Sequence, residues 1–295
     1  MSKTRTKTSE ISPSGARGTG TLYVVATPIG NLEDITLRAL RVLKEVDLIA
    51  AEDTRHTRKL LTHFGISTPT ISYYKEKEQE RSAVIINKLQ EGQDIALVSD
   101  AGTPGISDPG SILVRKAVAA NIEIIPIPGP SSLTAAISVA GISDSSFVFL
   151  GFAPTRKNQR QNLLLSLRLE KRNLIFFEAP HRLKSFLQDC LTMLGDRDVF
   201  WCRELTKMHE EFTRDALSII LSLCKDKKIK GESVFIIAGA ASEPEISDTD
   251  IKELLRLFKK SGGKSLRDAV RSISTEHRIA RSTVYKQALK IWEKI

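Results

Sequence analysis

Strand-like and helix-like segments alternate along most of this 295-residue chain, and that alternation limits the folds open to it. In the first half, short apolar runs typical of strands occupy 21–29, 48–51, 70–74, 94–99 and 122–127. Amphipathic stretches typical of helices lie between them, at 37–46, 54–64, 80–90 and 111–120. Because neighbouring parallel strands need a crossover segment between them, this order predicts a parallel α/β sheet covered by helices.

The alternation starts again after the segment PGPSS at 128–132. Strand-like runs follow at 147–150, 173–177, 198–203, 210–213 and 233–238, with helix-like stretches at 159–169, 182–194 and 216–223. We therefore predict two α/β domains, at 20–132 and 133–241, with the junction between them near residues 130–145.

The two ends of the chain differ from this body in composition. Residues 1–19 are polar and basic, which predicts a flexible tail, and the acidic, proline-containing stretch 242–248 predicts a linker. Beyond it, 249–295 contain three helix-like segments, at 251–260, 266–274 and 282–294. Three short helices with a serine cap expected at Ser282 predict a module that resembles a helix-turn-helix. Its expected apolar stripes are Leu254, Leu257 and Phe258 in the first helix and Tyr285, Leu289 and Trp292 in the last.

The net charge of +9 is concentrated at these ends. Residues 1–20 carry four basic and one acidic side chain, and residues 249–295 carry twelve basic and five acidic ones, so the body between them is close to neutral. Basic ends on a neutral body are typical of an enzyme that grips a polyanion with its ends. The alternative is a solvated surface that only aids solubility.

Composition excludes several classes of protein. No stretch approaches the roughly 20 consecutive apolar residues of a membrane span, and the polar N-terminus lacks the apolar stretch of a secretory signal. The three cysteines, Cys190, Cys202 and Cys224, are odd in number and far apart, which favours a reducing cytoplasm over a disulfide framework. Because the cysteines lack metal-ligand spacing and the five histidines are scattered, we expect no metal site.

The strongest candidate for a functional loop is Asp100–Gly110, which follows the apolar strand-like run at 94–99. Three glycines and two prolines in these eleven residues predict a rigid loop with exposed backbone groups. The loop lacks the GxxxxGK[ST] pattern of a nucleotide P-loop. Ser107 and Asp108 are expected to cap the helix that follows.

Other motifs also follow predicted strands, where α/β sheets bind their ligands. In the first half these are TPIGNL at 27–32, AEDTRH at 51–56 and PIPGPSS at 126–132. In the second half they are GFAPTR at 151–156, FEAPHR at 177–182 and RELTK at 203–207. A glycine cluster, Gly15–Gly20, precedes the first strand, so it does not fit a dinucleotide fingerprint.

Taken together, TPIGNLEDITLRAL, AEDTRHTRKLL, VSDAGTPGISDPG, PGPSS, GFAP, EAPHRL and RELTKMHEE resemble the tetrapyrrole methylase superfamily. Within it they are most similar to the branch of 16S ribosomal RNA (cytidine-2′-O)-methyltransferases, over roughly residues 20–240. The resemblance implies two α/β domains with the active site in the cleft between them. It also implies S-adenosylmethionine as cofactor, a cytidine 2′-hydroxyl in the decoding region of 16S ribosomal RNA as acceptor, and a homodimer.

The resemblance also carries site residues over by motif. Those expected to contact the cofactor are Pro28, Gly30, Asp100, Ala101, Gly102, Thr103, Ser131, Ser132, Phe152, Ala153, Thr206, Ala238 and Gly239. One departure is plain: where the family usually has a histidine-rich stretch with asparagine, this chain reads Tyr73–Glu80, with Tyr74 and Glu76 in place of histidines. Histidine-based catalysis at this point is therefore in doubt.

Methyl transfer from a sulfonium needs a positioned nucleophile and a group that takes its proton. The candidates for catalysis are Glu52, Asp53, Arg55, Glu178 and Glu204, among which the sequence does not rank a base. The residues expected to contact RNA are His181, Arg182, Lys207, Lys264, Arg267, Arg278, Arg281 and Lys286. Two other functions stay open, a tetrapyrrole C-methyltransferase and a non-enzymatic nucleic-acid-binding regulator.

Overall fold

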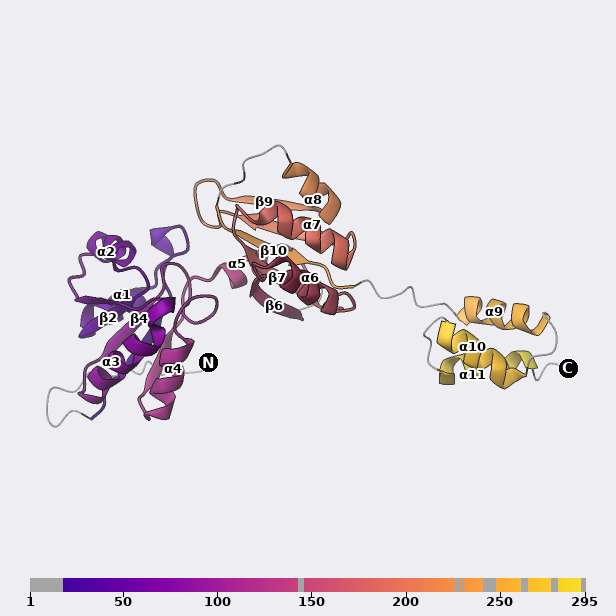
Figure 1. Cartoon of the computed structure of the whole chain (residues 1–295), viewed down its shortest axis with the longest axis horizontal. Helices are drawn as coiled ribbons and strands as arrows, with labels where there is room; N and C mark the ends of the chain where they lie inside the picture. The colour runs from indigo at the N-terminus through magenta and orange to yellow at the C-terminus, as the bar shows by residue number, and fades with distance from the viewer. Residues whose placement is uncertain are drawn as a thin grey trace, which may run out of the picture. The chain divides into compact units, whose positions relative to one another are not determined.

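A computed structural model describes residues 18–142, 146–225, 229, 231–240, 248–260, 265–276 and 281–292 of the chain. The chain forms two compact units that divide after Ala240, an α/β body and a C-terminal helical module (Figure 1). The tail predicted at 1–19 lies outside the described residues up to residue 17, as does most of the predicted linker at 242–248.

The first sheet of the body is entirely parallel, as predicted. Its strand order is β3-β2-β4-β1-β5. The strands are β1 (Leu22–Val25), β2 (Leu48–Ala51), β3 (Thr70–Ser72), β4 (Ile95–Val98) and β5 (Ile124–Ile127). The helices are α1 (Leu37–Glu45), α2 (Thr54–His63), α3 (Glu78–Gln90) and α4 (Ser111–Ala119), with short 3-10 turns η1 (Leu32–Asp34) and η2 (Lys75–Lys77).

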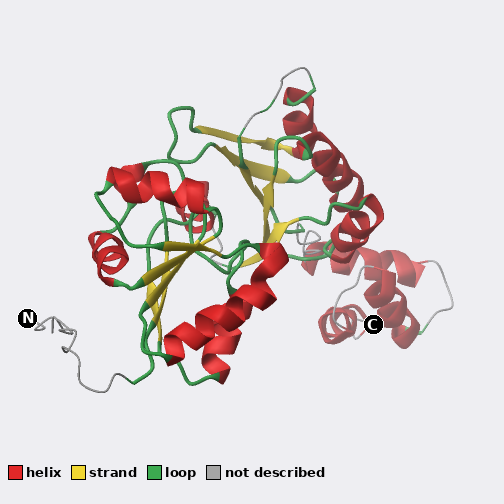
Figure 2. Ribbon diagram, turned by 60° about the vertical axis from the view of Figure 1, so that its left-hand side comes forward, coloured by secondary structure: helices red, strands yellow, loops and turns green. Residues whose placement is uncertain are grey.

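Both faces of this sheet are covered by helices, which explains why its strands are apolar throughout (Figure 2). In β2, Ile49 and Ala51 pack with α1 and α2, whereas Ala50 between them packs with α3 and α4 on the other face. All residues of β4 are buried. The parallel direction places the carboxyl ends of β1, β2 and β4 at one edge of the sheet.

The second sheet is mixed, and its strand order is β6-β7-β10-β8-β9. Only β6 and β7 run parallel, whereas β10 is antiparallel to both β7 and β8, and β8 is antiparallel to β9. The strands are β6 (Phe147–Phe152), β7 (Asn173–Glu178), β8 (Asp198–Arg203), β9 (Glu211–Ala216) and β10 (Ser233–Ile237). The helices are α5 (Ser132–Ala140), α6 (Lys157–Ser166), α7 (Leu183–Leu194) and α8 (Leu217–Leu223).

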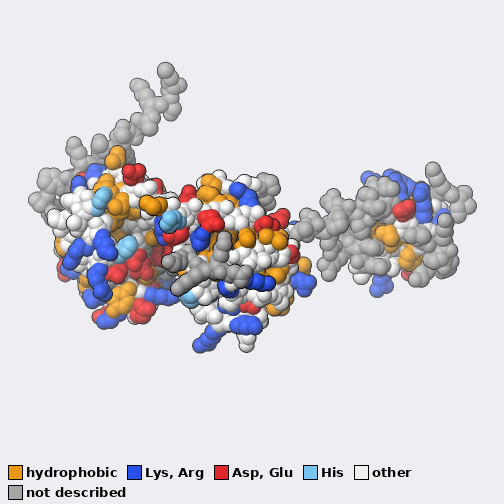
Figure 3. Space-filling view, turned by 90° about the horizontal axis from the view of Figure 1, so that it is seen from above, with side chains coloured by type: hydrophobic (Ala, Val, Ile, Leu, Met, Phe, Trp, Pro, Cys, Tyr) orange, Lys and Arg blue, Asp and Glu red, His pale blue; other side chains and the backbone are white. Residues whose placement is uncertain are grey.

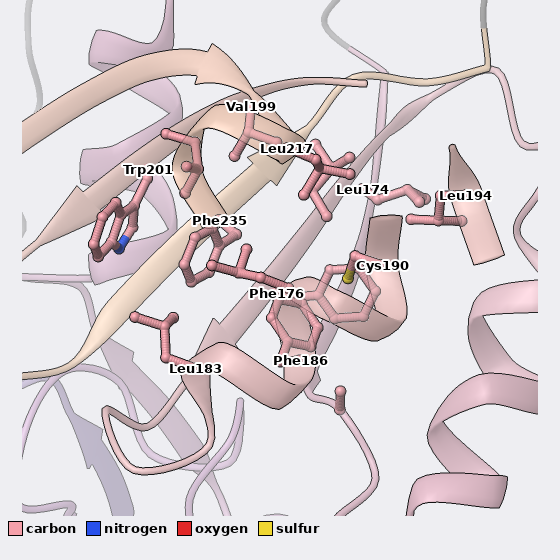
Figure 4. Packing of buried hydrophobic residues seen from close by; sticks show 14 of the residues in the cluster. Leu174, Phe176, Leu183, Phe186, Cys190, Leu194, Val199, Trp201, Leu217 and Phe235 are labelled. Carbon is pink, nitrogen blue, oxygen red and sulfur yellow. The ribbon is translucent and has the colours of Figure 1, made fainter. Parts of the chain in front are cut away.

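One face of the second sheet packs against α6, α7 and α8 around an aromatic core (Figure 4). There Trp201 stacks on Phe235 with ring centroids 5.6 Å apart, and Phe186 contacts both Phe235 and Phe176. The other face packs against α5 through Ala136 and Ala140. The sequence analysis did not predict α5, because its segment was interpreted as the junction between the domains. The boundaries proposed at 132 and 241 stay predictions.

The C-terminal module consists of α9 (Asp248–Lys260), α10 (Leu266–Glu276) and α11 (Arg281–Trp292), so three helices form where they were predicted. Its core contains Ile251, Leu255, Ala269, Val270, Ile273, Val284 and Ala288. The stripe predicted in α11 is displaced by one residue: Val284 and Ala288 are buried, and Tyr285 is 46% exposed. Because α11 begins at Arg281, Ser282 lies in its first turn and is not its cap.

None of the helices in the described ranges is long and apolar enough to cross a membrane. Over the same ranges, no group of three or more histidine, cysteine or acidic side chains is arranged to hold a metal ion.

Candidate active site

The loop that follows β4 is tied to the loop that follows β1 by the backbone. Thr27 and Gly102 each donate an N–H to the other's carbonyl oxygen, at 2.9 Å in both directions. Gly102 has φ +78, a conformation that glycine adopts without strain. The Thr27 hydroxyl also donates to the Ser99 carbonyl at 3.0 Å. These bonds fix the start of the glycine-rich loop against the first strand.

A second tie joins the glycine-rich loop to the end of β2. The Asp53 N–H donates to Oδ1 of Asp100 at 3.0 Å, and the Asp100 N–H lies 3.3 Å from Oε2 of Glu52. Asp53 also caps α2, because its Oδ1 accepts the N–H of Arg55 at 2.8 Å. The AEDTRH motif therefore supports the glycine-rich loop through Glu52 and Asp53, and Glu52 also lines the pocket described below.

The helix after the loop is capped differently from the prediction. Its cap is Gly110, at φ +147, and the side chain that accepts the Gly110 N–H is Glu78, at 2.9 Å. The same Glu78 oxygen accepts the hydroxyl proton of buried Tyr73 at 3.2 Å. The Tyr73–Glu80 stretch thus supports the start of α4, while Tyr74 and Glu76 lie outside the described lining of the pocket below. Ser107 and Asp108 do not cap the helix and instead line that pocket.

A pocket of about 250 Å³ opens between the first-sheet loops and the second sheet. From the first half its lining residues are Ile29, Glu52, Asp100, Ala101, Ser107, Asp108 and Ser132. From the second half they are Phe152, Phe177, Glu204, Leu205, Lys207, Glu232, Ser233 and Val234. Residues that are far apart in the sequence therefore meet in one concave site, as ligand pockets require.

Five carboxyl groups and one ammonium group line this pocket, so it favours a cation. The ammonium is Lys207, whose Nζ donates to Oε1 of Glu204 at 2.8 Å. Burial raises the pKa of Glu52, and the nearby carboxylates of Asp108 and Asp100 raise it further, against a backbone hydrogen bond from Asp100 that lowers it. Burial also raises the pKa of Asp108, whose hydrogen bond with Ser99 opposes the rise.

A strained loop from the second half, Glu204–Lys207, closes one side of the pocket. Glu204 and Thr206 both have positive φ, +53 and +64, which is costly for residues other than glycine. The Thr206 N–H donates to Oε1 of Glu210 at 2.7 Å. A Cβ on Gly30 would lie only 2.8 Å from the Leu205 carbonyl oxygen. Gly30 was expected to let a ligand approach, but the close approach it permits is to this loop.

The GFAP loop after β6 is held from below by two arginines. Arg182 donates to the carbonyls of Ala153 and Pro154 and lies 3.4 Å from Oε1 of Glu178. Buried Arg160 donates to the carbonyls of Pro154 and Thr155, both at 3.3 Å. Arg182 therefore directs these donors at the protein's own backbone and at Glu178, and its contact with RNA stays a prediction. These bonds set the position of Phe152 at the pocket.

Glu178, predicted as a catalytic candidate, lies beneath this loop. Its side chain is 0% exposed, and burial raises its pKa, opposed by the Ala179 N–H and by Arg182. Its Oε2 has no hydrogen-bond partner among the described residues. Glu178 lies outside the described lining of the pocket, so its position supports a structural role.

The structure brings some predicted residues together and separates others. Of the expected cofactor contacts, Asp100, Ala101, Ser132 and Phe152 line the pocket, while Pro28, Gly30, Gly102, Thr103, Ser131, Ala153 and Thr206 lie in the loops that carry the lining. Of the catalytic candidates, Glu52 and Glu204 line it, and Asp53 and Arg55 lie at the start of α2 with the Arg55 side chain 94% exposed. Of the RNA contacts, Lys207 lines it, and His181, Arg267, Arg281 and Lys286 are exposed elsewhere. Lys264 and Arg278 lie outside the described residues.

The Ala238–Gly239 turn was expected to close the pocket, and its position contradicts that expectation. In the register of the second sheet, Ser233 at the start of β10 pairs with Glu178 and Arg203, whereas Ile237 at its end pairs with Leu174 and Val199. Ala238 follows Ile237, so the turn lies at the opposite end of β10 from the pocket-lining Ser233.

Sequence reasoning missed several pocket residues for a common reason. It searched the carboxyl ends of strands, whereas Glu232 and Ser233 lie at the amino end of β10, which reaches the site because β10 is antiparallel to its neighbours. Ile29, Phe177 and Leu205 are apolar residues inside the quoted motifs that were not assigned to the site, and Val234 lies in β10. Ser107 and Asp108 belong to the loop that the sequence singled out, and only their assigned role was wrong.

Comparison with known proteins gives concordant matches. Residues 21–221 match the family model described as Tetrapyrrole (Corrin/Porphyrin) Methylases. The chain is 48% identical over 275 residues to the ribosomal RNA small subunit methyltransferase I of Synechocystis sp., covering 92% of this chain and 98% of that one. It is 49% identical over 220 residues to the protein of the same name from Thermotoga maritima, covering 75% of this chain and 99% of that one. The crystal structure of a diphthine synthase, 16% identical, superposes with a TM-score of 0.60 over 74% of this chain and 90% of the other.

Proposed function

We propose that the pocket is the catalytic site for methylation of small-subunit ribosomal RNA. The reason is that this chain belongs to the tetrapyrrole methylases and, within them, to the ribosomal RNA small subunit methyltransferase I family. The enzyme is an S-adenosylmethionine-dependent methyltransferase. It transfers the methyl group to the ribose 2′-hydroxyl of a cytidine in the decoding region of 16S ribosomal RNA.

One observation carries the proposal, the gathering of carboxyl groups at the end of a glycine-rich loop. Glu52, Asp100, Asp108, Glu204 and Glu232 line the pocket, and Lys207 is already paired with Glu204. S-adenosylmethionine supplies an activated methyl group on a positively charged sulfonium, and it also carries an ammonium. Both positive groups fit a negatively charged lining. The Ser233 hydroxyl, buried without a hydrogen-bond partner among the described residues, is available to the ligand's polar end.

Among the candidates for the base, the geometry favours Glu52. A base must be ionised at working pH and still hold a proton well enough to remove one, so a raised pKa improves it. Burial raises the pKa of Glu52 in this sense, and its carboxylate lines the pocket. Glu204 also lines the pocket, but Oε1 of its carboxylate accepts from Lys207. Asp53 caps a helix, and Glu178 lies below the GFAP loop.

Cationic groups beside the pocket are suited to hold the phosphates around the acceptor ribose. Arg55, whose side chain is 94% exposed, lies in the first turn of α2, two residues after the cap Asp53. Lys207 reaches the pocket from the second half. We assign them to orienting the substrate, with exposed His181 as a further contact.

The wider context of the reaction is part of the proposal. We place the enzyme in the cytoplasm, where its ribosomal substrate is assembled, and expect it to act on RNA within the small subunit as a homodimer. The basic residues of the C-terminal module that the structure describes, Arg267, Arg281 and Lys286, are exposed and available for the RNA backbone.

The test is methyl transfer from radiolabelled S-adenosylmethionine to small ribosomal subunits that lack the modification, compared with naked 16S ribosomal RNA and with uroporphyrinogen III. We expect label in RNA, at a nucleotide whose 3′ linkage resists alkali, because a 2′-O-methyl group blocks cleavage there. Label in uroporphyrinogen would establish the tetrapyrrole C-methyltransferase instead. Specific binding of duplex DNA without turnover would establish the regulator.

A pair of variants tests the assignment of the base. Glu52→Gln should lower kcat, measured at saturating S-adenosylmethionine, by about 100- to 10,000-fold, the usual contribution of a general base, and should also weaken cofactor binding because the pocket loses one carboxylate. Glu91→Gln, at an exposed position after α3, removes a carboxylate outside the described pocket lining and should leave kcat unchanged. A kcat for Glu52→Gln within threefold of the wild type would exclude Glu52 as the base.

A further inference from the structure

A second hollow lies in the C-terminal module, between α10 and α11. Its volume is about 470 Å³, within the range of roughly 300–1,000 Å³ that small-ligand pockets occupy. Six residues line it, Arg267, Val270 and Arg271 from α10 and Arg281, Ser282 and Tyr285 from α11. Arg267 and Arg271 are four residues apart, as are Arg281 and Tyr285, so each pair shares one face of its helix.

The polar lining of this hollow is entirely cationic or neutral over the described residues. Arg267, Arg271 and Arg281 are exposed, and no acidic residue is among the six that line it. In the space-filling view, lysine and arginine side chains gather along one side of the module (Figure 3). Guanidinium groups at such a concentration form a site for anions and match phosphate geometry in particular.

Tyr285 adds an aromatic surface that the core of the module does not use. Its neighbours Val284 and Ala288 are fully buried and anchor α11, whereas Tyr285 is 46% exposed at the hollow. An exposed aromatic ring beside phosphate-binding arginines is the arrangement by which proteins hold single-stranded nucleic acid, with a base on the ring and the backbone on the cations.

The length of one relative indicates that the module is separable from the chemistry. The Thermotoga maritima relative is matched over 99% of its length by 220 residues of this chain. A protein of that length can hold the α/β body, residues 20–240, but not the helical module as well. A role of the module in gripping substrate is therefore easier to understand than a role in methyl transfer.

We infer that this hollow binds an unpaired nucleotide of the RNA substrate, with its phosphates on Arg267, Arg271 and Arg281 and its base stacked on Tyr285. The inference rests on the proposed function for the identity of the nucleic acid. A concave site of this kind differs from duplex reading by a helix-turn-helix, in which a convex helix enters the major groove. The module is therefore a single-strand clamp.

The test measures binding of the full-length protein to a fluorescein-labelled 12-nucleotide single-stranded RNA by anisotropy over a range of salt concentrations. Arg271→Gln should weaken binding and reduce the slope of log affinity against log salt by about 0.7, the value for one phosphate contact to a single strand. Tyr285→Leu should weaken binding by about tenfold with an unchanged slope, because stacking does not release counterions. Arg256→Gln on α9 removes one exposed charge of the same module away from the hollow and is the matched control.

Several outcomes would overturn the inference. One is an Arg271→Gln protein that binds like Arg256→Gln, and another is a Tyr285→Leu protein that binds like the wild type. Tighter binding to the same sequence as duplex RNA or duplex DNA would also do so. Circular dichroism melting of each variant ensures that a loss of binding reflects the hollow and not the fold, and all three positions are exposed enough to tolerate the change.

Methyl transfer by the wild type separates this inference from the proposed function. If the wild type labels 16S ribosomal RNA and Arg271→Gln binds RNA like the control, only the clamp is wrong. If the wild type labels no RNA but the two hollow variants lose RNA binding as expected, the clamp stands and the proposed reaction is wrong. Cofactor affinity should be the same in all of these proteins.

Discussion

Replacing Gly30 by alanine tests whether the Glu204–Lys207 loop is pressed against the first half of the body. Gly30 does not have a left-handed backbone, so alanine adds only steric bulk. Its Cβ would lie 2.5 Å from Cγ of Lys207 and 2.8 Å from both the Leu205 carbonyl oxygen and Oγ1 of Thr206. Ordinary contact begins at 3.4 Å, so the Leu205 backbone must retreat by 0.6 Å.

The cost of this movement follows from what the loop contains. The Lys207 side chain can swing away, but the Leu205 carbonyl belongs to a loop with two residues at positive φ, which has little freedom to adjust. Overpacking of this kind costs about 1–3 kcal/mol of unfolding free energy. The same shift moves Glu204 and Lys207 at the pocket, and we expect the Kd for S-adenosylmethionine to rise about tenfold, since displacements near 1 Å cost up to about 100-fold in function.

Urea unfolding and isothermal titration calorimetry measure the two effects. Gly18→Ala is the matched control, because a Cβ there meets nothing within 4 Å and the backbone is not left-handed. It should leave both quantities unchanged. If Gly30→Ala unfolds at the same urea concentration as Gly18→Ala and binds the cofactor equally well, the loop is not pressed on Gly30 and the reasoning fails.

Three further results follow from features of the body. Arg160→Met should lower the free energy of unfolding by about 3–5 kcal/mol, because it leaves the carboxylate of Asp189 buried without its ion-pair partner 2.6 Å away. Adding Asp189→Leu should restore part of the lost stability. A loss below about 1 kcal/mol in urea unfolding would contradict this prediction. The affinity for the cofactor should rise as pH increases from about 5 to 7.5. The raised pKa values of Glu52 and Asp108 keep a fraction of these carboxyl groups protonated at the lower pH. Because a bound cation favours ionised carboxylates, binding at that pH should release protons. Calorimetry in two buffers of different ionisation enthalpy measures the release, and a Kd independent of pH would oppose it. Phe152→Ala should weaken cofactor binding by several-fold with little change in the free energy of unfolding, since the side chain is 44% exposed and lines the pocket. If the variant and the wild type bind the cofactor with equal affinity, Phe152 is not part of the site.

The parallel first half of the fold could be predicted because each of its local signals agrees with the whole. Apolar runs of four residues, buried on both faces, fit only strands covered on both sides, and the short connections left only crossover helices between them. The glycine-rich loop could be located for the same reason. Its position after β4 and its three glycines both pointed to a ligand loop.

The second half of the fold was less predictable because the local sequence of a strand does not indicate its direction in the sheet. An apolar run reads the same whether its strand is parallel or antiparallel, so nothing in 233–238 indicated that β10 runs against β7 and β8. The Ala238–Gly239 turn was consequently placed at the site, and Glu232 and Ser233 were missed. Helix α5 was missed because its small residues between PGPSS and Gly141 resembled a junction.

Side-chain roles were the least predictable, because they depend on partners far away in the sequence. Asp108 has the residue type of a helix cap, yet Gly110 is the cap, Glu78 accepts the Gly110 N–H, and Asp108 lines the pocket. Arg182 carries the charge of an RNA contact, yet backbone carbonyls of the GFAP loop occupy its guanidinium. Neither partner could be identified from spacing.

The strand order of the first sheet affects how fast the sheet can fold. Leu22 of β1 pairs with Ile95 and with Ile124, so both strands that flank β1 come from segments made long after it. Pairings between such distant segments form slowly, because the chain must close a large loop before any contact compensates for the lost entropy. The bridge between Thr27 and Gly102 extends this pairing into the glycine-rich loop. During refolding, the capacity to bind the methyl donor should therefore appear only with the last kinetic phase. A nascent chain that is released before β4 emerges lacks the glycine-rich loop that holds the cofactor.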